Sequence, residues 1–338
     1  MRMRVWTGAA LALAIALTST ACGGDSGDDV DGLVTVHYGL PTNSYFISTV
    51  GVQYALQNGY FEDEGLNVVV TPLPGATTAI RAMLSGEQDI VNTGGDTAIL
   101  AWQNGAPIKI INSPVAKGTD VLVARSEIQT IEDLAGGRFA ISDPGSTGEV
   151  LGRVVLERHG VDPDSVQFVG LGSPADRVRA MISDQVDATA ATILILEPVL
   201  DAIANGEMRV LTSFADEFPD IPLSYNITTD SMIAERSDVL IQFLRAEIRG
   251  YRWAQENPEA AAAIAVEFIE DTPLELLELG MQGMSELDVY GLDGGISAER
   301  IGRTQQTLVD LGQLPAISEP DEVANLDLVQ EAVEGLDD

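Results

Sequence analysis

Apolar and polar positions alternate along most of the chain with two different periods. Short apolar runs, of which 33–40 is the first, are typical of buried strands. Between these runs, apolar residues recur every three or four positions, as they do in helices that pack one face against a sheet. Strands that alternate with helices of about 10 to 15 residues indicate βαβ units and a mainly parallel sheet. The pattern therefore predicts an α/β fold.

This alternation runs through the chain twice. The first series predicts strands at 33–40, 66–73, 89–94 and 108–115, separated by helices at 44–58, 76–86 and 96–105. The second series predicts strands at 120–126, 138–143, 165–172, 186–192 and 209–214, with helices at 147–159, 174–183 and 194–205. Beyond residue 225 the chain becomes mostly helical, and apolar spacing predicts a long helix over 238–256 that Pro258 ends.

Two short segments repeat at equivalent points of the two series. "RAMLSGEQDIV" begins at Arg81 and "RAMISDQVDAT" begins at Arg179. Each combines a helix end, a short turn with an acidic residue and a buried strand, and each helix follows a loop that contains proline. The repeat predicts two lobes of similar topology.

The N-terminal segment has the features of an export signal. Arg2 and Arg4 precede an apolar run, 9–17, that is too short to span a bilayer. Small residues then lead to Cys22, the only cysteine of the chain. This arrangement resembles a bacterial lipoprotein signal, which implies a signal peptide over 1–21 and a lipid on Cys22. The alternative is ordinary secretory cleavage after Ala21, which would leave an unpaired thiol at the new N-terminus.

The residues after Cys22 predict a flexible tether, because 22–32 is acidic and rich in glycine. A hydrophobic content of 45% suffices for a sizeable core, and no second apolar run approaches the length of a membrane span. The net charge of −34 argues against nucleic-acid partners, since phosphates would be repelled. A GC-rich genome and adaptation to high salt both remain explanations of that charge.

Small, hydroxylic and glycine-rich segments follow the predicted strands. In open parallel sheets, ligands bind beyond the carboxyl ends of the strands, near helix N-termini. The segments at these ends let a ligand approach backbone N–H groups closely and also offer hydroxyl groups. They lie at 41–45, 94–97, 143–149 and 170–176, with Thr192 after a further strand.

The sharpest of these segments is "SDPGSTGEVLG". Ser146 and Glu149 have the spacing of a capping box, which marks the start of a helix. Its N–H groups either serve a plain capped helix or bind an anionic or polar group of a ligand. Asp96 also has two interpretations, as an N-cap or as a cleft residue that favours an amino group on the ligand.

Motifs of enzyme chemistry are missing from the sequence. His37 and His159 are the only histidines, and neither H-E-x-x-H, G-x-S-x-G nor a Walker A motif occurs. The segment 170–175 matches the dinucleotide pattern G-x-G-x-x-A, but no acidic residue ends the next strand as ribose binding requires. With a single cysteine, disulfides and cysteine-based metal sites are excluded. We therefore predict no catalytic residue, no metal and no cofactor.

Four segments together resemble a known family. "GVQYALQNGYFEDEGLNVVV", "AIRAMLSGEQDIVNTGGDTAI", "IEDLAGGRFAISDPGSTGE" and "VDATAATILILEPVL" occur in the order seen in solute-binding proteins for sulfonates, taurine, nitrate and thiamine pyrimidine precursors. These proteins serve ABC importers, and the resemblance covers residues 33–268. One departure is that Ile193, Leu194, Ile195 and Leu196 stand where family members often carry an aromatic residue.

The resemblance implies a type II periplasmic-binding-protein fold, in which two α/β lobes enclose a central ligand cleft. Lobe 1 would comprise 33–117 and 215–338, and lobe 2 would comprise 118–214, with crossings near 115–121 and 212–226. It also implies a set of ligand-binding residues, in which Tyr225 could stack on the ligand. This set is Thr42, Asn43, Tyr45, Gly95, Asp96, Thr97, Ser146, Thr147, Ser173, Thr192 and Tyr225.

The implied function is that of a binding protein rather than an enzyme. It would hold a small polar organic ligand outside the cytoplasm and deliver it to an ABC permease and its ATPase. We expect a monomer that a lipid anchors to the outer face of the cell membrane. Two alternatives stay open: a biosynthetic enzyme of the same fold that makes the thiamine pyrimidine, and an extracellular ligand sensor.

Overall fold

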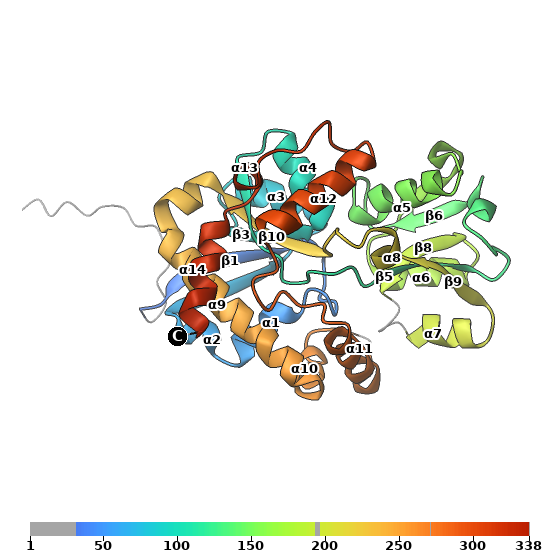
Figure 1. The fold of residues 1–338 in the computed structure, drawn as a ribbon. Coiled ribbons are helices and arrows are strands. Elements are labelled where there is room, and N and C mark those ends of the chain that lie inside the picture. Colours follow the sequence, from blue (N-terminus) through green and yellow to red (C-terminus); the bar gives the residue numbers. More distant parts are fainter. Residues whose placement is uncertain (1–31, 193–196, 271, 338) are drawn as a thin grey trace, which may run out of the picture.

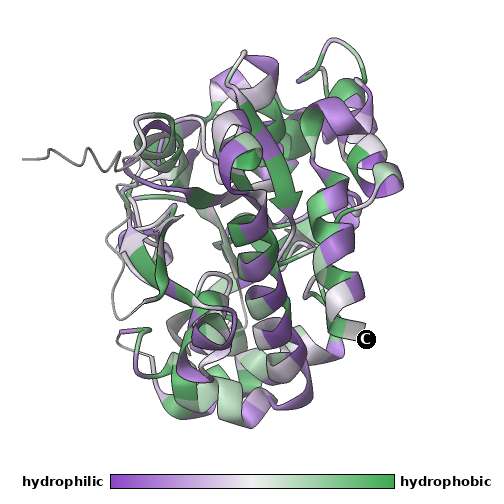
Figure 2. Cartoon of the chain, turned by 90° about the vertical axis from the view of Figure 1, so that its left-hand side faces the viewer, coloured by the Kyte–Doolittle hydropathy of each residue, from purple (hydrophilic) through white to green (hydrophobic). Residues whose placement is uncertain are grey.

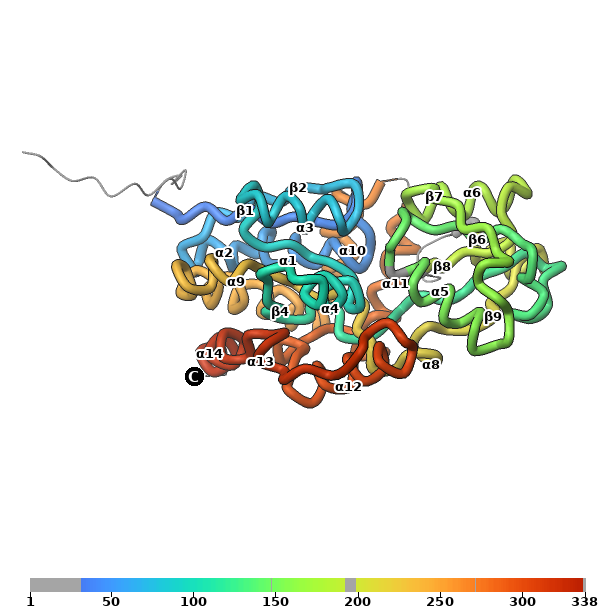
Figure 3. Tube along the Cα trace, turned by 90° about the horizontal axis from the view of Figure 1, so that it is seen from above, coloured from blue at the N-terminus to red at the C-terminus, as the bar shows by residue number. Residues whose placement is uncertain are grey.

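The computed structural model describes residues 32–337 except 193–196 and 271. The signal peptide, Cys22 and most of the predicted tether therefore lie outside the described residues. The described chain contains two five-stranded sheets, which occupy opposite halves of the molecule (Figure 1). Viewed from above, the two halves lie side by side along the long axis of the molecule (Figure 3).

The first sheet has the strand order β2-β1-β3-β10-β4. Strand β1 pairs in parallel with β2 and β3, whereas β10 is antiparallel to both β3 and β4. The bounds are β1 (Val34–Leu40), β2 (Leu66–Pro72), β3 (Ile90–Gly94), β4 (Ile108–Asn112) and β10 (Ser224–Thr229).

The second sheet repeats this arrangement in the order β7-β6-β8-β5-β9. Strand β6 pairs in parallel with β7 and β8, and β5 is antiparallel to β8 and β9. The bounds are β5 (Asp120–Arg125), β6 (Arg138–Ile141), β7 (Gln167–Gly170), β8 (Ala188–Thr192) and β9 (Met208–Ser213). The prediction of two lobes with similar topology is therefore confirmed.

In each sheet, the fourth strand comes from the segment that has just crossed between the halves. The chain crosses at 113–119, between β4 and β5, and returns at 214–223, between β9 and β10. Because each crossing strand enters its new sheet in the reverse direction, two of the four pairings in each sheet are antiparallel. The mainly parallel sheet that the alternation predicts thus has an antiparallel side.

Lobe 1 is the first sheet with its helices, and lobe 2 is the second sheet with its own. The helices of lobe 1 are α1 (Gly51–Gln57), α2 (Tyr60–Asp63), α3 (Ala76–Leu84), α4 (Gly95–Gln103), α9 (Asp230–Glu256), α10 (Pro258–Ala265), α11 (Leu274–Glu286), α12 (Ala298–Asp310), α13 (Pro320–Val323) and α14 (Leu326–Asp337). Those of lobe 2 are α5 (Thr147–Arg158), α6 (Pro174–Ile182), α7 (Glu197–Ala204) and α8 (Phe214–Glu217).

Two helices differ from their predicted bounds. The helix predicted over 44–58 begins only at Gly51, because the preceding residues form turns in which the Phe46 N–H donates to Thr49 Oγ1 at 2.9 Å. The long helix α9 begins at Asp230, but its backbone leaves the helical conformation at Arg236 (φ −140°, ψ 41°), so a short first segment precedes the helix predicted over 238–256. Its start is set by Thr229, whose side chain caps the helix by accepting a hydrogen bond from the Met232 N–H.

The core of lobe 1 forms where α9 packs its apolar face against the sheet and neighbouring helices. The Phe243 ring lies 5.2 Å from the Phe61 ring and 5.4 Å from the Tyr38 ring, between centroids. The helices seen in Figure 2 carry hydrophilic and hydrophobic residues along different sides, as expected for helices that cover a core. Within the described residues, none of the helices has both the length and the apolar character that a membrane span needs.

Candidate ligand-binding site

A cleft of about 1240 Å³ lies between the two lobes. Its lobe 1 wall consists of 41–48, which follow β1, and 74–75, which follow β2. Its lobe 2 wall consists of 142–143 after β6 and 171–179 after β7, together with Asp120 at the start of β5. The walls thus form at the carboxyl ends of parallel strands in both lobes, where ligands bind in α/β sheets.

A third wall comes from residues far along the chain. Ile269, Glu270, Thr272, Pro273 and Leu276 also line the cleft. They belong to the segment that leads from α10 into α11, and α11 lies at the gap between the lobes in both Figure 1 and Figure 3. Our sequence analysis did not assign this segment to the site, because no strand end or helix N-cap motif marks it.

The loop after β1 is held by its own hydrogen bonds. Thr42 Oγ1 donates to the Ser44 carbonyl at 2.7 Å, and the Tyr45 hydroxyl accepts a hydrogen bond from Gln53 Nε2 at 2.8 Å. The Tyr45 ring lies 5.5 Å from the Phe268 ring, and partial burial raises the pKa of the Tyr45 hydroxyl above its usual value. Tyr45 and Phe46 therefore give the cleft an aromatic surface on lobe 1.

Ser173 caps the helix that forms part of the lobe 2 wall. Its hydroxyl accepts a hydrogen bond from the Asp176 N–H at 3.2 Å and donates to the Asp176 carboxylate at 2.7 Å. Asp176 also pairs with Arg179 at 3.0 Å. The structure therefore places Ser173 in the cleft lining, with its hydroxyl already engaged at the start of α6.

Arg177 is another cleft residue that the sequence analysis did not predict. It lines the cleft although its exposed fraction is only 9%. Burial lowers the pKa of its guanidinium, and the nearby Asp120 carboxylate opposes that shift. The sequence "DRVR" is typical of an exposed turn of a helix. The burial of Arg177 follows from how α6 packs within lobe 2, which the local sequence does not predict.

Acidic groups outnumber basic groups along the cleft. The described lining contains four carboxylates, those of Asp120, Asp143, Asp176 and Glu270, and the two guanidinium groups of Arg177 and Arg179. Four negative and two positive charges leave an excess of two negative charges. Such a lining favours a ligand that carries an amino group or another cationic centre.

The two lobes approach each other closely at one edge of the cleft. Gly75, with a φ of +94°, packs so tightly that a Cβ there would lie 2.6 Å from Asp143 Oδ2. Gly75 belongs to lobe 1 and Asp143 to lobe 2, and both line the cleft. The two walls therefore meet across the cleft at this point.

The structure places some of the predicted site residues in the cleft lining and others elsewhere. Thr42, Asn43, Tyr45 and Ser173 lie together in the cleft lining. Thr147 is the first residue of α5 and Thr192 is the last of β8, but their side chains are outside what the structure describes.

The remaining predicted residues do not line the cleft. Asp96 and Ser146 are buried at the starts of α4 and α5, and Thr97 Oγ1 donates to Asp96 Oδ1 at 3.4 Å. A Cβ at Gly95 would overlap the Pro222 carbonyl, so this glycine allows α4 to pack against the returning crossing. Tyr225 lies in the core of lobe 1, where its hydroxyl shares a hydrogen bond with Thr304 at 3.2 Å.

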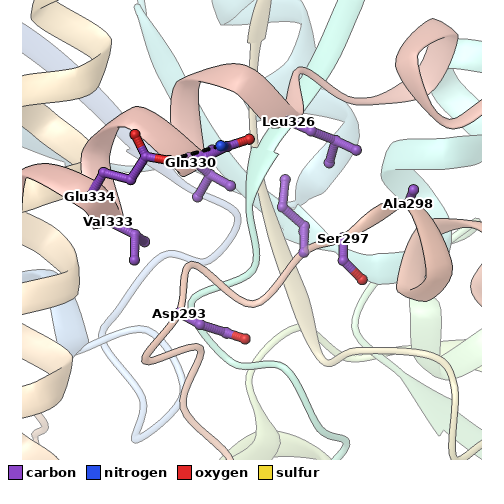
Figure 4. A pocket seen from close by; sticks show the side chains of 9 residues that line it. Asp293, Ser297, Ala298, Leu326, Gln330, Val333 and Glu334 are labelled. Atoms are coloured by element: carbon purple, nitrogen blue, oxygen red, sulfur yellow. Dashed lines mark hydrogen bonds between the residues drawn. The ribbon is translucent and has the colours of Figure 1, made fainter. Parts of the chain in front are cut away.

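A smaller hollow of about 310 Å³ lies on lobe 1, between the N-terminus of α12 and the outer face of α14 (Figure 4). Its polar side chains are bonded to their neighbours: Gln330 donates to Glu334 at 2.8 Å, and Asp293 pairs with Arg300 at 3.1 Å. The inter-lobe cleft, which is larger and lined by both lobes, is the better candidate for the ligand site.

Two α/β lobes with matching strand orders, two crossings and a cleft between them define a type II periplasmic-binding-protein fold. Residues 47–261 match the sequence model of the family described as "NMT1/THI5 like", and the chain belongs to this family.

Relatives of known class support this assignment. The chain is 25% identical to the putative binding protein YtlA of Bacillus subtilis over 286 residues, covering 81% of this chain and 82% of that protein. It is also 25% identical to the formylaminopyrimidine-binding protein of Halalkalibacterium halodurans, covering 79% and 80%. These relatives are binding proteins, not enzymes, as the sequence predicts for this chain.

A solved structure shows the same fold. The alkanesulfonate-binding protein SsuA of Xanthomonas axonopodis pv. citri, bound to MOPS, matches with a TM-score of 0.68 and 17% identity. The match covers 86% of this chain and 97% of that protein. The predicted fold class is therefore confirmed.

Proposed function

We propose that this protein is the extracytoplasmic solute-binding component of an ABC importer. It binds a small polar organic ligand in the cleft and presents the closed, ligand-bound shape to a membrane permease whose ATPase drives import. The observation that carries this proposal is the cleft lined by both lobes, which only two chain segments connect. The proposed bounds are 33–117 with 215–338 for lobe 1 and 118–214 for lobe 2, and α8, at the start of the returning crossing, packs on β5 and β9 of lobe 2.

The ligand class follows from the lining of the cleft. Its excess of acidic groups favours an amino group, and the Tyr45 and Phe46 rings offer a flat apolar surface. A taurine-like sulfonate and an aminopyrimidine both carry an amino group. The names of the formylaminopyrimidine-binding relative and of the alkanesulfonate-binding structure agree with these two choices.

Ligand binding is proposed to work through a hinge between the lobes. A ligand that contacts both walls stabilises the closed arrangement of the lobes relative to the open one. The backbone dihedral angles that change on closure are those of the two crossings, 113–119 and 214–223. Of the predicted ligand-binding set, Thr42, Asn43, Tyr45 and Ser173 are the residues whose places in the cleft support a direct role.

A thermal-shift screen tests this function. Its compounds are sulfonates, taurine, nitrate and aminopyrimidines, and a binder present at 100 times its Kd stabilises the folded protein by about 2.7 kcal/mol. We expect at least one compound with an amino group to raise the Tm and to be recovered unchanged. If no compound shifts the Tm, or if the protein consumes its ligand, the proposal fails.

Anchoring through Cys22 is a further part of the proposal. A lipid on this cysteine would hold the monomeric protein at the outer face of the cell membrane, with 22–32 as the tether. The variant Cys22→Ser should move from the membrane fraction to the soluble fraction of the producing cells. Equal retention of the variant and the wild-type protein in membranes would refute the anchor.

A further inference from the structure

A buried cation lies beneath the lobe 2 wall of the cleft. Arg177 is in the first turns of α6, which begins at the Ser173 cap. Its side chain extends towards α5: Nη1 lies 3.8 Å from the point that a Cβ on Gly148 would occupy, and Ser146 Oγ lies 4.0 Å from the same point. The guanidinium and the Ser146 hydroxyl thus both lie close to Gly148, in the first turn of α5, a helix of 12 residues.

Two polar atoms of this cluster are buried without a partner. Arg177 Nε and Ser146 Oγ have no hydrogen-bond partner among the described residues, and the two side chains are 9% and 8% exposed. Ser146 holds the N-cap position of α5, yet its hydroxyl makes no capping hydrogen bond. Buried donors without acceptors destabilise a protein, so their retention beside a ligand cleft points to an acceptor that arrives with the ligand.

The surrounding charges leave the cluster positive. The N-terminus of α5 and the Arg177 guanidinium lie close together here, and each favours a negative charge. Glu149 is engaged by the Gly145 N–H at 2.9 Å and by Arg153 at 3.0 Å. Asp176 is engaged by Ser173 and Arg179.

Asp120 is the acidic residue whose charge acts on Arg177. A guanidinium has five N–H donors, and one carboxylate can accept at most two of them in a bidentate pair. Donors therefore remain for a second acidic group.

We propose that Arg177 in the cleft wall, with Ser146 and the first-turn N–H groups of α5 buried behind it, forms an anion subsite that takes the acidic group of the ligand from the cleft. This rests on the proposed function and narrows it. The acidic group is a carboxylate, sulfonate or phosphate, and the excess of carboxylates elsewhere in the cleft selects an amino group on the same ligand. The ligand class is thus a small zwitterion, with Arg177 as the residue that determines specificity for its acidic end.

Calorimetric titration with matched probes tests this subsite. Taurine, β-alanine and O-phosphoethanolamine each join an amino group to a different acidic group, and ethanolamine lacks the acid. We expect at least one of the three acids to bind and ethanolamine not to bind. Failure of all three acids, or equal binding of ethanolamine, overturns the anion subsite.

Variants of the subsite give the second arm of the test. Arg177→Gln should weaken binding of the acid probe at least about 30-fold, and Ser146→Ala about 3- to 10-fold, since charged hydrogen bonds contribute more than neutral ones. The control Arg138→Gln removes a cation at the start of β6 that pairs with Asp187, outside the cleft lining, and should change the Kd less than about twofold. Unchanged affinity in Arg177→Gln would overturn the assignment.

Three further outcomes are decisive. If Arg177→Gln does not fold, as circular dichroism would show, the Ser146→Ala titration decides alone, because loss of an unbonded hydroxyl leaves the helix cap unaffected. If an aminopyrimidine without an acidic group binds while the acids do not, the anion subsite is wrong and the proposed function stands. If none of these compounds binds, the proposed function fails as well.

Discussion

At the residue scale, Glu247 is a carboxylate fully buried in the core of lobe 1. It accepts hydrogen bonds from Asn112 Nδ2 at 2.7 Å and from Asn226 Nδ2 at 2.9 and 3.0 Å. The Asn226 Oδ1 atom in turn accepts from the Tyr38 hydroxyl and from Asn92 Nδ2, each at 2.9 Å. This network joins α9 to β1, β3, β4 and β10. Burial raises the pKa of Glu247 to about 7, although the amide donors oppose the shift.

The raised pKa makes stability depend on pH. In the unfolded chain this carboxyl has a pKa of about 4.3, so below that pH it is protonated in both states and costs nothing. As the pH rises from about 4.3 to 7, the unfolded chain releases this proton while the folded state keeps it, so unfolding becomes steadily more favourable, and above pH 7 the effect levels off. We expect the wild-type protein to lose about 2–3 kcal/mol between pH 4.5 and 8 relative to Glu247→Gln, which cannot ionise.

Urea denaturation at pH 4.5, 6 and 8 measures this difference. Glu259→Gln, which changes an exposed glutamate of α10, is the matched control and should follow the wild-type curve. Parallel pH dependences for wild type and Glu247→Gln would show that this carboxyl does not titrate between the two states.

The sequence predicts some site residues and misses others for a physical reason. Thr42, Asn43, Tyr45 and Ser173 follow strand ends, so the general rule for α/β sheets finds them. Tyr225 is buried by its place in β10, between β3 and β4, and no local pattern reveals that. Arg177 shows the opposite case. Its local sequence is typical of an exposed helix, but its side chain is buried because it packs near the start of α5.

At the element scale, the loops that carry Gly75 and Asp143 bring the two lobes into contact. A side chain at position 75 would meet the Asp143 carboxylate, which the Ser142 hydroxyl holds at 3.1 Å. The Asp143 side chain must then turn away, or the lobes must move apart. Either change disturbs the arrangement that closes the cleft.

Gly75→Ala tests this contact, and Gly86→Ala is its matched control. Both glycines have a positive φ, +94° and +82°, but nothing lies within 4 Å of a Cβ at position 86. We expect both variants to lose about 1 kcal/mol of unfolding free energy through backbone strain. Only Gly75→Ala should also weaken binding of the ligand found in the thermal-shift screen, by about threefold or more. Equal Kd values for the two variants would exclude a role of this contact in closure.

Most elements are predicted from the sequence because their apolar periods are local. The strands and helices of both series lie close to their predicted positions, and the repeated segments coincide with α3–β3 in lobe 1 and α6–β8 in lobe 2. The antiparallel pairings of β5 and β10 join distant parts of the chain, so no local period predicts them. The cleft wall formed by Ile269, Glu270, Thr272, Pro273 and Leu276 is missed for the same reason.

At the scale of the whole molecule, two lobes of one topology share a cleft and are joined by two crossings. This division is predictable because the pattern of elements repeats along the chain. The cleft lining is not predictable, since it depends on how the lobes face each other. The net charge of −34 of the whole chain argues against nucleic-acid partners.

A crystal structure of the complex with a hit from the screen tests the central claim most directly. The account predicts one unmodified ligand between the loop 41–48 of lobe 1 and the segment 171–179 of lobe 2, in contact with both. A ligand bound to one lobe alone, a ligand in the hollow between α12 and α14, or a chemically altered product in the cleft would contradict it.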